Sequence, residues 1–199
     1  MSRRPFMDAL AAGGLVFDGA MGTALYERGF LYNSCLDGAS LSHPDVVRRV
    51  HEDYAAAGAN VLQTNTFGAN AYRLGVHGLR EKVRDINRRG VELARAAAGE
   101  TAYVVGSIGP TGLVMKTVEA HEHERIRAAF AEQASALSEA GVDALILETF
   151  RQPEELHLAI EGVREGSKGA VPLIASCSFD AFGTMADGTG PEAMEELLL

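Results

Sequence analysis

The sequence predicts an α/β fold, specifically a (β/α)8 barrel of the TIM type truncated to about its first five βα units. Short apolar runs alternate with segments of helical periodicity, which is the order expected for a parallel sheet with right-handed crossovers. One strand and its exit are also repeated within the chain, as a barrel of similar units requires. A closed eightfold barrel takes about 250 residues, so we expect the 199 residues to form one barrel domain, 1–199, that is incomplete at its C-terminus.

Five apolar runs are expected to form the strands. Parallel strands that are covered on both faces have nearly continuous hydrophobic sequences. The runs lie at residues 15–17, 61–63, 103–108, 144–147 and 173–176.

Helical segments separate these runs. Residues 44–57 begin with Pro44 and stop before Gly58, while 79–98 and 122–140 also end before a glycine. The last helix, 191–199, ends on three leucines in the middle of an apolar face, with no capping residue. We therefore expect about three of the eight strands to be missing.

An internal repeat favours a barrel over a doubly wound sheet. Residues 57–67 align without gaps on residues 140–150 and share Ala, Gly, Leu, Thr and Phe. The same helix end, strand and strand exit are thus built twice. A barrel gathers such exits on one face, where its active site forms.

Composition limits the partners and the compartment. A formal charge of -9 argues against nucleic-acid binding, which needs clustered Lys and Arg. No signal peptide and no apolar run of about 18 residues is present, so we expect a cytoplasmic protein that does not span a membrane. Cys35 and Cys177 are far apart and match no zinc motif, so we expect reduced thiols.

Two strand exits carry candidate binding residues. After the first run, Asp18, Gly19 and Ala20 begin a segment whose amides could hold a carboxylate, although Asp18 could instead cap the next helix. After the second run, Thr66 and Phe67 lie in a polar cluster around one ring. The alternative for this cluster is a plain loop with Phe67 in the core.

The fourth exit delivers a carboxylate from a buried strand. Glu148 follows four apolar residues, and burying it costs free energy unless it is paired. No Lys, Arg or His lies at the other strand exits. The third exit, 106–112, has no ionisable group, so we expect its backbone to contribute only to the shape of the pocket. A cationic ligand is therefore a reasonable partner, and Glu148 with Asp18 would face the ammonium group of an amino acid.

The remaining reactive residue types are expected to be structural. The six histidines lie in helices or in the loops before them, so we expect solvated or capping roles. Cys177 lies within the fifth run with no base beside it, so we expect it in the core.

Four motifs follow the strand exits in order. They are DGAMGT at 18–23, QTNTF at 63–67, SIGP at 107–110 and LETF at 147–150. Together they resemble the homocysteine S-methyltransferase family, and the similarity runs from about Leu15 to the chain end. It is closest to the homocysteine domains of cobalamin-dependent methionine synthase and of bacterial fusions with methylenetetrahydrofolate reductase.

The resemblance implies a (β/α)8 barrel in which Zn²⁺, held by three cysteines, activates homocysteine sulfur for methylation to methionine. The methyl group would come from a small-molecule donor, or from cobalamin or folate carried by another module. By position, Asp18 and Glu148 correspond to residues that hold the substrate amine. Gly19 and Ala20 correspond to backbone near the carboxylate, and Thr66 and Phe67 to the pocket wall.

The same resemblance places the zinc cysteines at the sixth and eighth strand exits, beyond the sequence in hand. Neither Cys35 nor Cys177 matches them, so we expect no metal ligand and no catalytic residue within this chain. An alternative function is a non-catalytic fragment or remnant that binds an amino acid. Another is a barrel enzyme with Glu148 as general base, which the lack of Lys, Arg or His at the exits disfavours.

Overall fold

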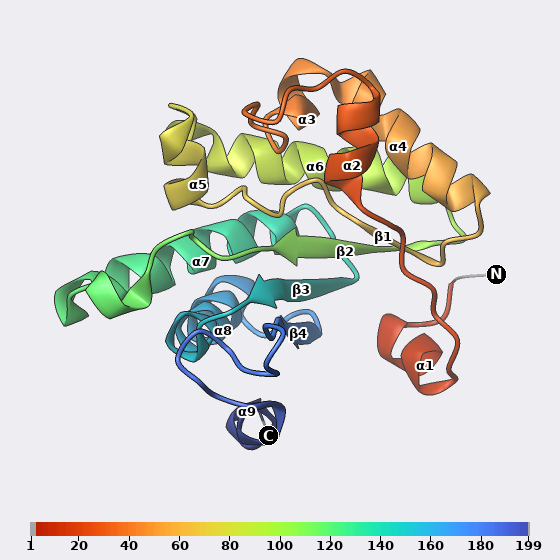
Figure 1. The fold of residues 1–199 in the computed structure, drawn as a ribbon. Coiled ribbons are helices and arrows are strands. Elements are labelled where there is room, and N and C mark those ends of the chain that lie inside the picture. The colour runs from red at the N-terminus through yellow and green to blue at the C-terminus, as the bar shows by residue number, and fades with distance from the viewer. Residues whose placement is uncertain (1–2, 199) are drawn as a thin grey trace.

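The computed structural model describes residues 3–198 and has an α/β fold around one parallel sheet. Each strand lies beside the next one in the sequence and parallel to it, in the order β1-β2-β3-β4, and the arrows of β2 and β3 in Figure 1 point the same way. The predicted alternation of strands and helices is therefore confirmed. The strands are β1 (Val61–Gln63), β2 (Tyr103–Ile108), β3 (Ala144–Phe150) and β4 (Leu173–Cys177).

Helices precede β1 and follow every strand. They match the predicted segments closely, except that 79–98 and 122–140 each begin with a separate turn of 3-10 helix. Residue 199 of the predicted last helix lies outside the described residues. The α-helices are α1 (Phe6–Ala11), α2 (Met21–Glu27), α3 (Ala39–Ser42), α4 (Pro44–Ala56), α5 (Ala71–Val76), α6 (Val83–Ala98), α7 (His123–Glu139), α8 (Pro153–Ser167) and α9 (Pro191–Leu198), and the 3-10 turns are η1 (Arg80–Lys82), η2 (Met115–Thr117) and η3 (Ala120–Glu122).

The predicted first strand, 15–17, is wrong as a strand. This segment makes one isolated parallel bridge, between Phe17 and Val61. Its backbone hydrogen bonds to the β1 region involve only Val16 and Asp18, which pair with Asn60 and Val61, so no longer ladder forms. Residues 3–198 therefore hold four strands rather than five, and β1 and β4 are the edges of a sheet that does not close within this range.

The two faces of the sheet bury different residues. Leu62, Val104 and Leu145 point outward into the main core, where helices α6, α7 and α8 cover them. Their neighbours in sequence, such as Val61 and Val105, point to the inner face and pack with α1. This alternation follows from the two-residue period of a β-strand.

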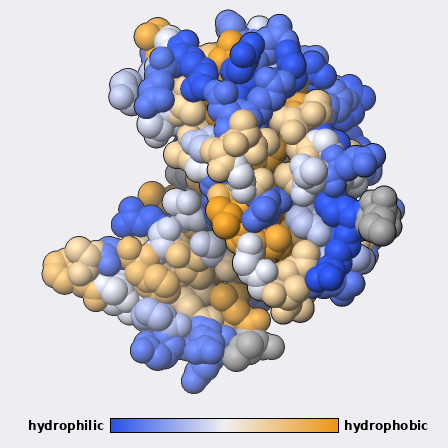
Figure 2. Space-filling view, turned by 90° about the vertical axis from the view of Figure 1, so that its right-hand side faces the viewer, coloured by the Kyte–Doolittle hydropathy of each residue, from blue (hydrophilic) through white to orange (hydrophobic). Residues whose placement is uncertain are grey.

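Helix α1 covers the inner face at the end where the strands begin. The ring of Phe6 meets Tyr103 edge-on at 5.4 Å, and the Arg3 guanidinium lies 4.2 Å above the same tyrosine ring. Figure 2 faces this end and shows a hollow between an upper part with a largely hydrophilic surface and a lower arm, with hydrophobic residues beside it. In the described part of the chain, no helix combines the length and apolarity needed to cross a membrane.

Helices α7 and α8 pack at unusually short range because α8 presents two glycines to α7. A Cβ on Gly162 would overlap the Arg127 carbonyl oxygen, and one on Gly166 would overlap the Ala131 carbonyl oxygen. The side chain nearest this contact is Phe130, whose ring lies 5.9 Å from that of Phe150 on β3. This aromatic contact is one part of the main core through which the helix pair packs on the sheet.

We predict that Gly166→Ala destabilises the protein by about 1–3 kcal/mol, because the added methyl group must separate two packed backbones. Gly75→Ala is the matched control. It lies in α5 with nothing within 4 Å of its Cβ, so we expect it to gain about 0.5–1 kcal/mol from its higher helix propensity. Urea unfolding of the three proteins measures both effects. Equal stability of Gly166→Ala and wild type would contradict the close packing.

One histidine departs from the predicted solvated or capping roles. His51 has no exposed surface, and neither ring nitrogen has a hydrogen-bond partner among the described residues. It lies on the buried face of α4 beside Val47 and Val50, and this burial lowers its pKa from 6.5 to about 4. The other five histidines are exposed or half-buried.

His51 predicts a loss of stability in acid. Between pH 6.5 and 4 the unfolded chain binds a proton that the folded chain excludes, so stability falls as the pH falls through this window. At pH 5 the loss is about 2 kcal/mol. We expect His51→Leu to remove this contribution, and His157→Gln, at an exposed histidine, to keep it. The test compares urea unfolding at pH 7 and pH 5, and parallel losses in wild type and His51→Leu would refute it.

Candidate functional site

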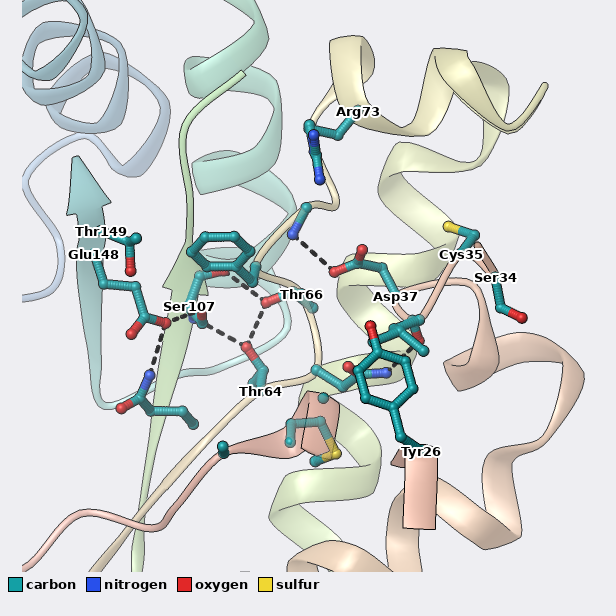
Figure 3. Close-up of a pocket in the computed structure, with 18 of the residues that line it drawn as sticks. Tyr26, Ser34, Cys35, Asp37, Thr64, Thr66, Arg73, Ser107, Glu148 and Thr149 are labelled. Carbon is teal, nitrogen blue, oxygen red and sulfur yellow. Dashed lines mark hydrogen bonds between the residues drawn. The ribbon is translucent and has the colours of Figure 1, made fainter. Parts of the chain in front are cut away.

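The candidate site is a cavity of about 580 Å³ at the carboxyl ends of the strands. The inner face of the sheet is apolar where the strands begin and becomes polar at their ends, with Gln63 on β1, Ser107 on β2 and Glu148 on β3. Figure 3 shows Ser107 and Glu148 pointing toward one another. The cavity brings together all six residues that the sequence singled out. They are Asp18, Gly19, Ala20, Thr66, Phe67 and Glu148.

Two neighbouring strands fix one oxygen of Glu148. Its Oε1 accepts hydrogen bonds from Gln63 Nε2 at 2.8 Å and from Ser107 Oγ at 2.5 Å. Its Oε2 accepts none from residues 3–198. Thr149 follows with φ +66°, and the β3–β4 register shifts at this point. The acid is thus held at a strained bulge with one oxygen available to a ligand.

Asp18 faces the same cavity and does not cap a helix. Both of its carboxylate oxygens lie within hydrogen-bond range of the Gln63 amide nitrogen, at 3.1 and 3.0 Å. The N-cap of α2 is Ala20, which makes no side-chain hydrogen bond, so the capping alternative is wrong. Burial, aided by the charge of Glu148, raises the pKa of Asp18 to about 7. Asp18 and Glu148 therefore both lie in the same poorly solvated part of the cavity.

The backbone at Gly19 and Ala20 is shaped by a tyrosine of α4. A Cβ on Gly19 would lie 2.8 Å from the Tyr54 hydroxyl oxygen, and that hydroxyl donates to the Ala20 carbonyl oxygen at 3.2 Å. Glycine is therefore needed at 19 for close packing. The amide N–H groups of Gly19 and Ala20 donate to no acceptor in the described chain, so both remain available to a ligand.

Thr66 and Phe67 join the exits of β1 and β2. The Thr66 hydroxyl is 2.5 Å from the Thr64 hydroxyl and 2.8 Å from the Ser107 carbonyl oxygen. The Phe67 ring lies against Gly109, where a Cβ would overlap it. Because Phe67 is 37% exposed, the alternative that places it in the core is wrong. Both residues form part of the cavity wall. The Thr66 hydroxyl already makes hydrogen bonds within the protein.

Several lining residues were missed from sequence. Asp37 accepts from the Gly68 amide at 2.8 Å, and burial raises its pKa, against the opposing effects of that hydrogen bond and of the Arg73 charge. Arg73 and His77 come from the α5 region rather than from a strand exit. Ser107, predicted to contribute only shape, instead binds Glu148. The period of two along β2 signals its inward direction.

The two cysteines differ in position. Cys35 lines the cavity, and burial raises the pKa of its thiol, so it stays protonated at neutral pH. Cys177 is half-buried on the edge strand and packs against the main core. Within residues 3–198 no three His, Cys, Asp or Glu side chains are close enough to hold a metal ion. These residues therefore do not fit a zinc site, and no metal-dependent step is assigned to them.

Fold and site together define an α/β chain with an acidic cavity at the carboxyl ends of parallel strands, a place where barrel enzymes bind small substrates. The family profile described as homocysteine S-methyltransferase matches residues 15–198. The chain belongs to that family, which confirms the resemblance seen in the sequence.

Similar proteins agree with this assignment. Methionine synthase of Mycobacterium tuberculosis is 32% identical in an alignment 198 positions long, which covers 92% of this chain and 16% of that protein. The S-methylmethionine–homocysteine S-methyltransferase of Pongo abelii is 31% identical over 99% of this chain and 52% of its own length. The metallated form of the homocysteine methyltransferase MmuM from Escherichia coli superposes with a TM-score of 0.82 at 27% identity, over 98% of this chain and 74% of that one. The chain thus spans only part of each relative.

We predict that Asp18→Asn stabilises the unliganded protein at pH 8. The folded-state pKa of about 7 lies above the ordinary 3.8, so stability falls as pH rises through that window, and the amide removes this loss. The gain in melting temperature should shrink toward pH 4. Glu100→Gln, at an exposed carboxylate, is the control and should show no such pH-dependent gain. A destabilised Asp18→Asn at pH 8 would show that burial does not strain this group.

Proposed function

We propose that the cavity binds homocysteine and that this chain supplies the homocysteine-binding part of an S-methyltransferase that forms methionine. The observation that carries the proposal is the pair of acids, Asp18 and Glu148, on the cavity wall. Beside them, the amides of Gly19 and Ala20 have no acceptor among residues 3–198. An amino acid presents the complementary ammonium and carboxylate groups. Family membership supplies the choice of homocysteine among amino acids.

The ammonium group is assigned to the two acids. Glu148 Oε2 has no protein donor within residues 3–198, while Oε1 is fixed by Gln63 and Ser107. A bound cation offsets the cost of keeping two carboxylates together in a poorly solvated place. It should therefore lower the pKa of Asp18 from about 7 and keep that group ionised at neutral pH.

The rest of the substrate follows from this placement. Its carboxylate is assigned to the Gly19 and Ala20 amides, which lie directly after Asp18 in the chain. Thr66 and Phe67 form the wall along its aliphatic part. The thiol then extends toward the mouth of the cavity, where a methyl donor can approach.

Residues 3–198 are proposed to correspond to the leading five βα units of a (β/α)8 barrel like that of the family, with 15–17 beside β1 as the first unit. When bound, the zinc ion implied by family membership would lower the pKa of the homocysteine thiol. The described residues offer no set of ligands for it. For the methyl donor, the names of relatives include betaine and S-methylmethionine as well as methionine synthase.

A second candidate is amino-acid binding without catalysis. The observation that favours it is the lack of any three-residue metal-ligand cluster in the described chain. Methionine formation, or its absence, when this chain is incubated with zinc, homocysteine and a methyl donor separates the two candidates. Both require the same amino-acid pocket, so the binding test below applies to either.

We predict that Glu148→Gln weakens homocysteine binding about 10- to 100-fold, because a hydrogen bond to a charged group is worth about 1.5–3 kcal/mol. Isothermal titration calorimetry gives the affinity. The analogue 4-mercaptobutyrate, which lacks the amine, should bind wild type and Glu148→Gln equally weakly. The control Glu139→Gln alters an exposed helical carboxylate and should bind homocysteine like wild type.

The analogue makes this test specific for the amine. If Glu148→Gln weakens 4-mercaptobutyrate as much as homocysteine, Glu148 does not contact the ammonium group. If wild type does not bind homocysteine, the proposed function fails.

A further inference from the structure

Arg73 is a cation without a partner on the wall of the cavity. Among the lysines and arginines of residues 3–198, it is the one that lines this space. Its guanidinium makes no hydrogen bond and no ion pair with any described residue, although most other arginines of the chain are paired with carboxylates. A guanidinium with five donors beside a cavity is therefore available to a ligand.

Two features hold Arg73 in this position. Asn70 caps α5 by accepting from the amides of Tyr72 at 3.1 Å and Arg73 at 3.0 Å, which fixes the backbone. On the other side Gly112, in the loop after β2, leaves space for the side chain. A Cβ at Gly112 would lie 3.1 Å from Arg73 Nη1 and 3.4 Å from its Cδ. The side chain therefore lies against backbone at a defined place.

The nearest acid does not neutralise this cation. Burial raises the pKa of Asp37, and the Arg73 charge only partly opposes this rise. The two side chains form no ion pair, and Asp37 Oδ1 accepts from the Gly68 amide instead. In Figure 3 Arg73 lies on the Asp37 side of Thr66, whereas Glu148 lies on the other side. The cavity thus has an acidic end at Glu148 and a separate cationic position at Arg73.

We propose that Arg73 forms an anion subsite for a carboxylate of the second substrate, the methyl donor. The inference rests on the proposed function, which assigns the homocysteine amine to Asp18 and Glu148 and its carboxylate to Gly19 and Ala20. Arg73 is then available to bind a second molecule, and the cavity volume of about 580 Å³ accommodates two small molecules. A guanidinium binds a carboxylate through two parallel hydrogen bonds, which sets orientation as well as affinity. The donor is thereby a small molecule that carries a carboxylate.

The test compares matched probes by titration calorimetry on the chain saturated with homocysteine. Glycine betaine and choline share a trimethylammonium group and differ in the carboxylate, and S-methylmethionine is paired with its carboxamide. We expect wild type to prefer at least one acid over its partner by about tenfold or more. Arg73→Gln should abolish that preference, and Arg73→Lys should keep part of it. Arg80→Gln, at an exposed cation outside the cavity, should leave it intact.

Homocysteine affinity, measured in the same series, separates the two proposals. We expect Arg73→Gln to bind homocysteine like wild type and to melt at the same temperature, since the side chain is exposed and unpaired. A large loss of homocysteine affinity in Arg73→Gln would assign the substrate's own carboxylate to Arg73 and overturn the subsite. Equal binding of acid and neutral probes by wild type, or no binding of either acid, would also overturn it. The proposed function fails only if homocysteine itself does not bind.

Discussion

The inward and outward alternation of side chains along three parallel strands is the constraint on which the rest of this structure depends. Leu62, Val104 and Leu145 face the helices, so their neighbours must face inward. The inward row is apolar where α1 covers it and polar where the strands end. If β3 shifted by one residue, Glu148 would face the helices and Leu147 would face the cavity. The packing of the helices on the outer face therefore also fixes which side chains line the cavity.

This placement makes the unliganded site costly. Glu148 and Asp18 share one poorly solvated wall, and burial raises the pKa of Asp18 to about 7. The protein satisfies Glu148 Oε1 and leaves Oε2 without a donor from the described residues. Under the proposed function, an ammonium group bound between the two carboxylates restores the stability lost here, because it replaces their mutual repulsion with attraction. Arg73 lies too far from both acids to form an ion pair with either, which keeps the acidic end available.

The order of strands and helices and the six lining residues could be predicted because periodicity and strand ends are local properties of the sequence. Features that depend on contacts between separate elements could not be predicted. Whether 15–17 becomes a strand is decided by how many backbone groups β1 offers it, and His51 is buried because α4 turns that face toward its neighbours. Arg73 lies on helix α5, six residues after Phe67, rather than at a strand exit, and the direction of its side chain depends on how α5 packs. Ser107 could have been found, since it has the same parity as Val105 on β2.

The internal repeat explains why similar sequences make different parts of one site. In the alignment of 57–67 with 140–150, Glu148 corresponds to Asn65, whose side chain donates to the Leu36 carbonyl oxygen and anchors the loop that carries Asp37. Phe67 and Phe150 also correspond, yet Phe67 is 37% exposed and Phe150 is fully buried. The bulge at Thr149 accounts for this difference. Glu148 faces inward like Ile146, and the extra residue after it turns Phe150 to the outer core. One strand exit thus supplies a cavity wall and a loop anchor, whereas the other places a carboxylate in the cavity and returns its phenylalanine to the core.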